Sequence, residues 1–349
     1  MSVPAAMPQH GNRMPELDGW RGISIALVLA AHLLPLGPKS WALNGTAAAM
    51  GMSLFFILSG FLITGFLLGD PKPGVADFLV RRLARIVPLA WLGMALALWF
   101  GGAEIGAYAP HFLFYANLPP FPLIGVTAHF WSLCVEMHFY LGIAVLYAIA
   151  GRRGLMLLPV LCLGFTAMRV SYGEELSIQT QFRIDEILAG AVLALANAGK
   201  FGAWPNRALN AANQPLLILL LAIASHPDSG FMNYLRPYLA ALLVGATIAH
   251  GNTRLGAALR LRALRYVAEV SFALYVIHPL LAHTWLGAGE GWEKYVKRPL
   301  LFAVLFGLAH VSTFYYERHW MRWGRLLSAR LSPQGSAGAP GAVHPERLR

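Results

Sequence analysis

The sequence predicts an all-α, polytopic integral membrane protein that crosses the bilayer about ten times. Hydrophobic residues make up 57% of its 349 residues and charged residues only 12%, whereas a soluble domain has about 25% charged residues. Spans of about 20 residues with short connections fill this length and leave no room for a sizeable extramembrane domain. Both cysteines, Cys134 and Cys162, lie in apolar stretches. We therefore expect neither a structural disulfide nor a cysteine metal site.

Hydropathy places the spans in ten segments and basic residues set their orientation. The segments are 20–38, 47–69, 87–101, 130–150, 154–169, 184–198, 214–226, 237–250, 267–288 and 299–317. With a cytoplasmic N-terminus, nineteen lysines and arginines fall on the inner side and seven on the outer side, and Arg21 at the inner rim completes the 27. The positive-inside rule then predicts that both termini are cytoplasmic. Because topology explains most of the net charge of +11, we expect no nucleic-acid partner.

Three parts of the chain follow from this topology. Residues 1–19 form a cytoplasmic N-terminal segment, residues 20–320 the membrane domain, and residues 321–349 a cytoplasmic, largely disordered tail. The tail is predicted because its end, from residue 333, is rich in Gly, Pro, Ala and Ser.

The first span carries an arginine and a histidine eleven residues apart, Arg21 and His32. Eleven helical residues make about three turns with a mismatch of roughly 20°, so both side chains share one face, about 16 Å apart along the axis. Arg21 then lies at the mouth of the span and His32 near mid-bilayer depth. An ionisable residue inside a span is a functional candidate because its desolvation is costly. The alternative is a neutral histidine bonded to a neighbouring helix.

The predicted cytoplasmic loop before the third span contains Arg81, Arg82 and Arg85. Residues three apart, such as Arg82 and Arg85, point to the same side of a helical turn. Their guanidinium groups bind phosphate oxygens in bidentate fashion, and a nucleotide or coenzyme A presents such phosphates at the cytosolic surface. The alternative is ordinary anchoring to anionic lipid.

Glu136 lies about two turns inside the fourth span. A carboxylate at this depth must be paired or protonated. It can orient or activate a histidine, bind an acceptor hydroxyl, or form a structural hydrogen bond between helices.

These motifs resemble those of the acyltransferase family 3 membrane O-acyltransferases. The resemblance rests on residues 16–23 with His32, the Arg-Arg-x-x-Arg-Ile-x-Pro run at 81–88, Trp-Ser-Leu-x-Val-Glu at 131–136, and further matches at 51–63, 182–190 and 271–279. Their order and spacing agree across roughly residues 16 to 320. Where many members carry Glu-Glu-Gln, this chain has Glu136-Met137-His138. His138 is therefore either an added acceptor contact or a neutral substitute for the amide.

The resemblance implies transfer of an acyl group, expected to be acetyl, from cytosolic acyl-coenzyme A to a hydroxyl of a carbohydrate. The phosphates would lie on Arg81, Arg82 and Arg85, with the pantetheine arm running past Arg21 towards His32. His32 would act as general base or as an acyl-carrying nucleophile. The expected location is the bacterial inner membrane, among membrane lipid. The acceptor is expected to be an envelope glycan such as a surface polysaccharide, lipopolysaccharide or peptidoglycan.

No permanently bound cofactor and no metal are expected. Some members of the family carry a fused extracytoplasmic domain. In this chain a second transfer step would need a separate extracytoplasmic transferase or polysaccharide-assembly protein.

Further residues are predicted to contact the acceptor. They are Asp18, Arg183, Asp185, Tyr275 and His278, with Glu136 beside Arg183 and Asp185 at the outer entrance. The alternative for Arg183 and Asp185 is a salt-bridged helix end. Pro279 is expected to kink the ninth span, so that Tyr275 and His278 close the tunnel, with structural packing as the alternative.

Two other classes of function compete with acyl transfer. A transporter or flippase of a glycan or lipid-linked sugar also places His and Glu inside the membrane, but it would not depend on coenzyme A, and no internal repeat is evident. A nonenzymatic scaffold predicts that His32→Ala leaves activity untouched.

Overall fold

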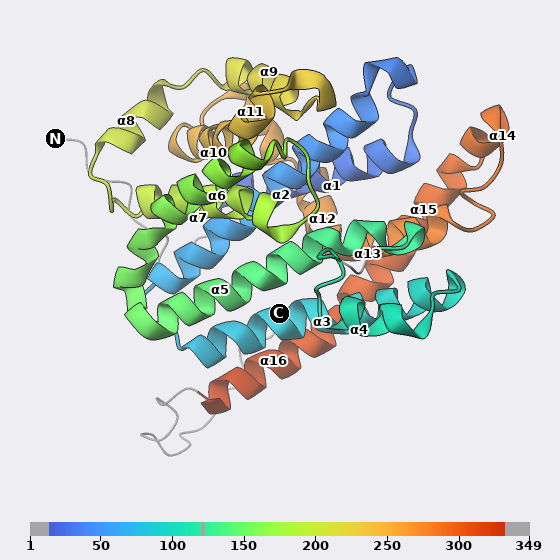
Figure 1. The fold of residues 1–349 in the computed structure, drawn as a ribbon, viewed down its shortest axis with the longest axis horizontal. Helices are drawn as coiled ribbons and strands as arrows, with labels where there is room; N and C mark the ends of the chain where they lie inside the picture. The colour runs from blue at the N-terminus through green and yellow to red at the C-terminus, as the bar shows by residue number, and fades with distance from the viewer. Residues whose placement is uncertain (1–13, 120–122, 332–349) are drawn as a thin grey trace.

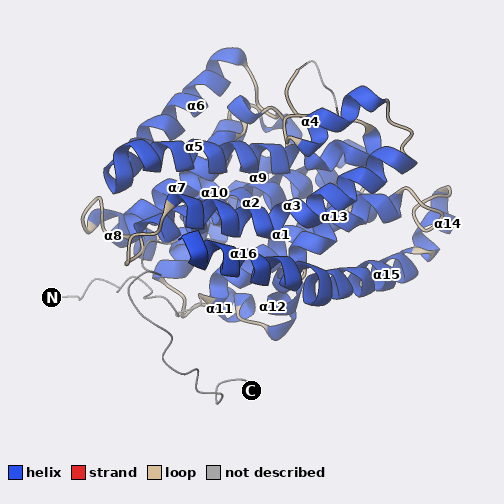
Figure 2. Ribbon diagram, turned by 90° about the horizontal axis from the view of Figure 1, so that it is seen from below, coloured by secondary structure: helices blue, strands red, loops and turns tan. Residues whose placement is uncertain are grey.

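The computed structural model describes residues 14–119 and 123–331, and within these residues it contains helices and loops but no strand (Figure 2). The predicted all-α class is confirmed for this part of the chain. The α-helices are α1 (Pro15–Leu33), α2 (Leu43–Leu68), α3 (Val75–Phe100), α4 (Tyr108–Phe112), α5 (Trp131–Gly154), α6 (Leu158–Tyr172), α7 (Ile184–Asn197), α8 (Trp204–Ala211), α9 (Gln214–Ser225), α10 (Met232–Ala249), α11 (Arg254–Leu259), α12 (Arg262–Glu269), α13 (Ser271–Ala282), α14 (Gly291–Val296), α15 (Arg298–Val311) and α16 (Arg318–Leu331).

Each of the ten predicted segments falls on one helix or on two successive helices. Four helical stretches of the described residues are long and apolar enough to cross a bilayer, namely Leu43–Leu68, Val75–Phe100, Gly125–Tyr172 and Gly291–Leu331. Two bent pairs, α8 with α9 and α12 with α13, raise the number to six when each pair counts as one span. The protein thus has four to six membrane-spanning elements by this measure. Ten spans and cytoplasmic termini stay predictions.

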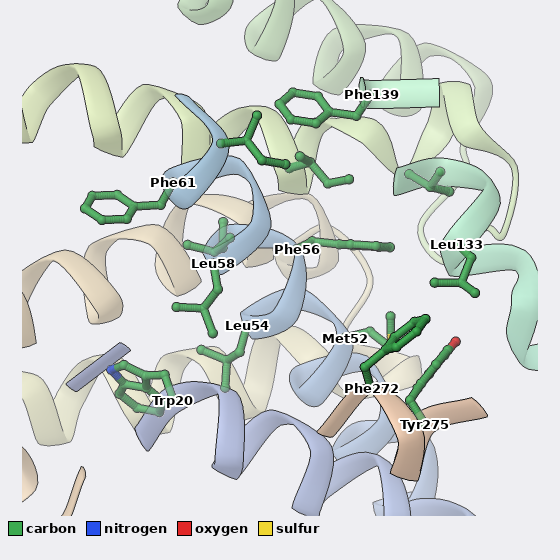
Figure 3. Packing of buried hydrophobic residues seen from close by; sticks show 14 of the residues in the cluster. Trp20, Met52, Leu54, Phe56, Leu58, Phe61, Leu133, Phe139, Phe272 and Tyr275 are labelled. Carbon is green, nitrogen blue, oxygen red and sulfur yellow. The ribbon is translucent and has the colours of Figure 1, made fainter. Parts of the chain in front are cut away.

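Helix α2 forms the centre of the bundle. It packs against α1 on one side and α7 on another, and it also contacts α5, α9 and α10 (Figure 1). Phe56, Ile57 and Leu67 are completely buried. Figure 3 shows α2 side chains reaching towards Trp20 of α1 and towards Phe272 and Tyr275 of α13. A helix that is largely apolar on every side is buried on most sides, which explains why α2 reads as a largely hydrophobic run.

Glycines let α2 and α7 cross at close range. A Cβ atom on Gly60 would lie 1.9 Å from the carbonyl oxygen of Ile187, and one on Gly190 would lie 2.1 Å from that of Ile57. Small residues at a crossing are typical of membrane helices, because packing rather than the hydrophobic effect holds such helices together. The two glycines therefore fix the distance between α2 and α7.

Two boundaries differ from the prediction. The predicted loop at residues 78–88 is helical, because α3 begins at Val75 and an Asp77–Arg81 ion pair of 2.5 Å spans its first turns. Ser328 of α16 donates a hydrogen bond to Asp77 and accepts one from Arg81, at 3.2 Å. Figure 1 shows α16 lying along α3.

The same helix corrects the predicted domain boundary at residue 320, which falls inside α16. Residues 321–331 belong to this helix, which packs on α3. The remainder of the predicted tail lies outside the described residues. In the ninth predicted segment, the bend of 67° lies between α12 and α13, at Val270, whereas Pro279 lies inside α13.

Candidate active site

One face of α2 borders three cavities in succession. Met52 lines the first cavity, Phe55 and Ser59 line the second, and Phe66 borders the third. Spacings of three, four and seven residues keep these side chains on one face of the helix. Helix α5 repeats the order, with Trp131 at the first cavity and Glu136 at the second. The three cavities are therefore arranged in series along the bundle.

The first and largest, here called the histidine cavity, has a volume of about 730 Å³. The polar and aromatic side chains on its wall come from α1, α5, α13 and the two loops that precede α5 and α7. They include His32, Asn117, His129, Trp131, Gln179, Arg183 and Tyr275. A cavity of this size accommodates a sugar-sized group.

His32 lines this cavity. A hydrogen bond to the backbone defines which of its ring nitrogens carries the proton. Its Nδ1 lies 2.9 Å from the carbonyl oxygen of Val28, and because a carbonyl only accepts, Nδ1 carries the proton. Nε2 is then the atom with a free lone pair. His278 repeats the arrangement with Leu274, at 3.1 Å, and its ring centroid is 5.2 Å from that of His32. His278 is 1% exposed and lies behind the wall of the cavity rather than on it.

The second, or central, cavity is small, at about 30 Å³, and carries most of the predicted catalytic charges. It is lined by Arg21, Ser59, Arg82, Arg85, Glu136 and Tyr140, together with apolar side chains. Glu136 is buried and accepts hydrogen bonds from Ser59 Oγ, at 2.9 Å, and from the hydroxyl of Tyr140. One carboxylate among three arginines leaves an excess of positive charge. Such an excess favours an anionic ligand.

The third, or arginine, cavity has a volume of about 180 Å³ and shares Arg82 and Arg85 with the central cavity. Arg81 and Arg325 complete its basic lining, and Phe66 and Phe78 form an apolar wall. The structure thus brings together the arginines of the predicted phosphate site and joins them, through Arg21, to the helix that carries His32.

Asp185 is placed differently from its prediction. It is fully buried between α6 and α7, where Arg169 lies 2.5 Å from its Oδ2 and Thr166 donates to the same oxygen. It is not among the residues that line the histidine cavity. Because a charge at this depth must be compensated, Asp185 holds the helices together, as in the salt-bridge alternative.

Arg183 joins the ion network to the histidine cavity. Its NH2 lies 3.2 Å from Glu186 Oε2, and its guanidinium stacks over the ring of Trp131, 5.1 Å from the centroid. Arg236 pairs with the same Glu186, at 2.9 Å. Glu136, in contrast, lies in the central cavity, so the predicted grouping of Glu136 with Arg183 and Asp185 is wrong. The sequence places all three residues towards the outer side, but the packing of α5 turns Glu136 to the central cavity and that of α7 turns Asp185 to Arg169 of α6.

Two further predicted contacts lie away from the histidine cavity. Asp18 is on α1 one turn before Arg21, at the end opposite His32, and it borders none of the three cavities. His138 lies 2.7 Å from Thr180 Oγ1 through its Nδ1 and does not border the cavity. Neither residue is positioned to touch an acceptor bound beside His32.

Several residues of these cavities were missed at the sequence level. Tyr140 follows Glu136 by four residues, a helical spacing that predicts their contact. Ser59 and Glu136 are 77 positions apart, so no local pattern connects them. His129 precedes the fourth-span motif in a short 3₁₀ segment, Gly125–Phe130, where neither helical nor strand periodicity signals that it faces the cavity.

Comparison with known proteins gives the family. The model of an acyltransferase domain, that of acyltransferase family 3, matches residues 14–318. The chain belongs to this family. The family match covers all three cavities except Met321 and Arg325. No solved structure matches the chain at a significant level.

Similar family proteins with curated names are bacterial. The putative peptidoglycan O-acetyltransferase YrhL of Bacillus subtilis is 27% identical, over 77% of this chain and 49% of that protein. The peptidoglycan O-acetyltransferase OatA of Listeria monocytogenes is 24% identical, over 78% of this chain and 50% of that protein. The O-acetyltransferase OatA of Staphylococcus aureus is 23% identical, over 76% and 50%. The chain spans about half the length of these relatives.

Proposed function

We propose that the protein transfers an acetyl group from cytosolic acetyl-coenzyme A to a hydroxyl of a bacterial envelope glycan, in the inner membrane. The observation that carries the proposal is the series of three cavities along α2, with arginines at one end and a histidine with a free Nε2 at the other. The names of the similar proteins agree with O-acetyl transfer to an envelope polymer.

The donor end suits coenzyme A. Arg82 and Arg85 border both the arginine and the central cavities, so their guanidinium groups are positioned to bind phosphate oxygens while the pantetheine arm enters the protein. Arg21 lies further along the same path and Glu136 compensates part of the charge. The thioester would then reach His32 from the side of the central cavity.

The acceptor end suits a carbohydrate. Sugar hydroxyls need several donors and acceptors on a wall that is otherwise apolar or aromatic. Asn117, Gln179 and Arg183 supply polar groups in the histidine cavity, and Trp131 and Tyr275 supply aromatic surface. His32 Nε2 would remove the hydroxyl proton or accept the acetyl group itself.

The test is transfer of radiolabelled acetyl from acetyl-coenzyme A to peptidoglycan, polysaccharide and lipopolysaccharide fractions, with membranes that contain wild-type protein or His32→Ala. We expect label in one fraction with wild type and at least 100-fold less with the variant at equal abundance. The matched control is His283→Ala. The exposed His283 also bonds a carbonyl oxygen four residues back through its Nδ1, at 2.8 Å, but lines none of the three cavities.

Transport of a glycan or lipid-linked sugar is the competing function. It predicts export without coenzyme A and no acetyl label in any fraction. Equal labelling by wild type and His32→Ala would instead show that the protein is an acetyltransferase but that His32 takes no part in the reaction.

A further inference from the structure

His129 differs from the other buried histidines because neither of its ring nitrogens makes a hydrogen bond of normal geometry among the described residues, although the backbone of Val126 lies near the ring. It is 8% exposed and lines the histidine cavity. His111, by comparison, is satisfied at both nitrogens, by the Ala107 carbonyl and by Thr127 Oγ1, and His278 is satisfied at one. A buried polar group without a partner costs about 1–3 kcal/mol. Such a group in a cavity wall needs an explanation.

The backbone of His129 is held firmly although its ring is not. The hydroxyl of Tyr275 donates to the His129 carbonyl, and Ser132 Oγ lies 3.4 Å from the same oxygen. With the Tyr275 hydrogen used in this way, Ser132 donates its hydrogen to the Tyr275 hydroxyl, at 2.6 Å. Figure 3 shows Tyr275 extending from α13. Residues from two helices therefore fix the backbone of His129 beside the cavity, and the positioned backbone is typical of a preorganised functional group.

His129 also belongs to a chain of imidazole rings that leads to His32. Its centroid lies 5.6 Å from that of His278, which in turn lies 5.2 Å from that of His32. His129 and His32 both line the histidine cavity, whereas His278 lies behind them. His32 and His129 thus line the same cavity from α1 and from the loop before α5. The ring nitrogens of His129 are themselves buried, so its unbonded ring must turn to bring one of them to a group in the cavity.

The hydrogen bond of His32 explains why a second imidazole is needed. When Nε2 attacks the thioester carbonyl, the new N–C bond forms, the C–S bond breaks and coenzyme A leaves as the thiolate. The acetylated ring then has no lone pair to use, since Nε2 carries the acetyl group and Nδ1 remains bonded to Val28. His32 cannot serve as base in the second step.

We propose that His129 is the general base of the acceptor step and that His32 carries the acetyl group. This rests on the proposed function. A ring nitrogen of His129 takes the proton of the acceptor hydroxyl, the oxygen bonds the acetyl carbon, and the N–C bond to His32 breaks, which restores neutral His32. The proton leaves His129 for water, and the thiolate of coenzyme A takes one from water. Thioester and alcohol have then become ester and thiol.

The experiment separates the two half-reactions in purified protein. Exchange of radiolabelled coenzyme A into unlabelled acetyl-coenzyme A, without acceptor, reports acetylation of the protein. Label in the envelope glycan reports the whole reaction. His129→Gln is expected to retain exchange within a factor of about three and to lose glycan transfer by about 10²–10⁴-fold, whereas His32→Gln loses both. Retained exchange also shows that His129→Gln is folded.

Hydroxylamine provides a readout that a merely structural role of His129 would not give. It attacks acyl-imidazoles without a general base, so wild type and His129→Gln should form acetyl hydroxamate at equal rates. His283→Gln is the matched control and should behave as wild type in all three assays.

Other outcomes overturn the proposal. His129→Gln that retains glycan transfer, or that loses exchange and transfer together, removes His129 from the acceptor step. Glycan transfer by wild type without exchange or hydroxamate means direct transfer, which refutes the division of roles and leaves the proposed function intact. Wild type that shows neither exchange nor transfer refutes the proposed function as well.

Discussion

At the scale of single residues, hydrogen-bond partners distinguish structural groups from candidate reactive ones. Asp185 Oδ2 pairs with Arg169 and accepts a hydrogen bond from Thr166. Glu136 accepts hydrogen bonds from two hydroxyl groups. His32 and His129 retain ring nitrogens that the protein leaves unpartnered on a cavity wall. Asn117 Oδ1 and Arg183 Nε, from residues that line the same cavity, are also without a partner. Because unmade hydrogen bonds are costly inside a protein, we expect a substrate to bind these groups.

Arg82→Gln should raise the KM for acetyl-coenzyme A about 10- to 100-fold and change kcat much less. A hydrogen bond to a charged group contributes about 1.5–3 kcal/mol, and each 1.4 kcal/mol corresponds to a factor of ten. Initial rates against acetyl-coenzyme A concentration measure the effect. Arg153→Gln, an exposed arginine at the end of α5, is the control. Equal KM values for both variants would mean that Arg82 does not bind the donor.

The predictability of the site differs from residue to residue. The offset between Arg21 and His32 is a local helical property, so the sequence predicted that both lie on one path, and α1 carries them as expected. His129 lies beside the cavity where Tyr275, 146 positions later, holds its carbonyl. Tertiary contacts of this kind have no local signature. The same reason explains why Glu136 and Asp185 were wrongly grouped.

At the scale of elements, the contact between α2 and α7 keeps the cavities aligned. Gly60 lies one residue after Ser59, so the face of α2 that meets α7 is fixed relative to the face that borders the central cavity. The sequence predicted both helices from hydropathy. It did not predict their separation, because two glycines 130 positions apart determine it together.

Gly60→Ala should lower the free energy of unfolding by about 1–3 kcal/mol, the usual cost of overpacking. The new methyl group would meet the Ile187 carbonyl of α7, which belongs to a rigid helix. Gly65→Ala on the same helix is the matched control, since nothing lies within 4 Å of its Cβ position. Denaturant titration in detergent measures both variants. Equal stability would show that α2 and α7 can separate without cost.

Asp185→Asn should destabilise the protein by about 3–5 kcal/mol, because it leaves the buried Arg169 guanidinium without a counter-charge. Glu293→Gln, which breaks the more exposed pair with Lys297 at 2.8 Å, should cost less than about 1 kcal/mol. Thermal unfolding in detergent distinguishes the two. A stable Asp185→Asn protein with impaired acceptor binding would instead return Asp185 to the substrate site.

At the scale of the whole molecule, the composition predicted the all-α membrane class, and hydropathy predicted the positions of the helices. Both depend on the residues themselves and not on how the helices pack. The number of crossings is harder to predict. Helices α8 and α9 meet at 90° and α12 and α13 at 67°, so two apolar segments that read as continuous are broken. Basic-residue asymmetry predicts an orientation, which helix packing alone does not.

The predicted orientation is testable with single cysteines. Glu290→Cys, between α13 and α14, should react with a membrane-impermeant maleimide in intact cells, and Arg153→Cys only after permeabilisation. The native Cys134 and Cys162 are buried, with 0% and 2% exposure, and supply a low background. The reverse pattern would invert the proposed direction of transfer.

The narrow central cavity has a consequence for the cell's energy supply. At about 30 Å³ it has room for about two or three water molecules, so it must widen before the pantetheine arm enters, and the arginines beside it repel small cations. Between turnovers, a path this narrow would oppose the passage of metal ions. The transfer would then proceed with little ion leakage across the membrane, and the thioester would supply the free energy that the transfer consumes.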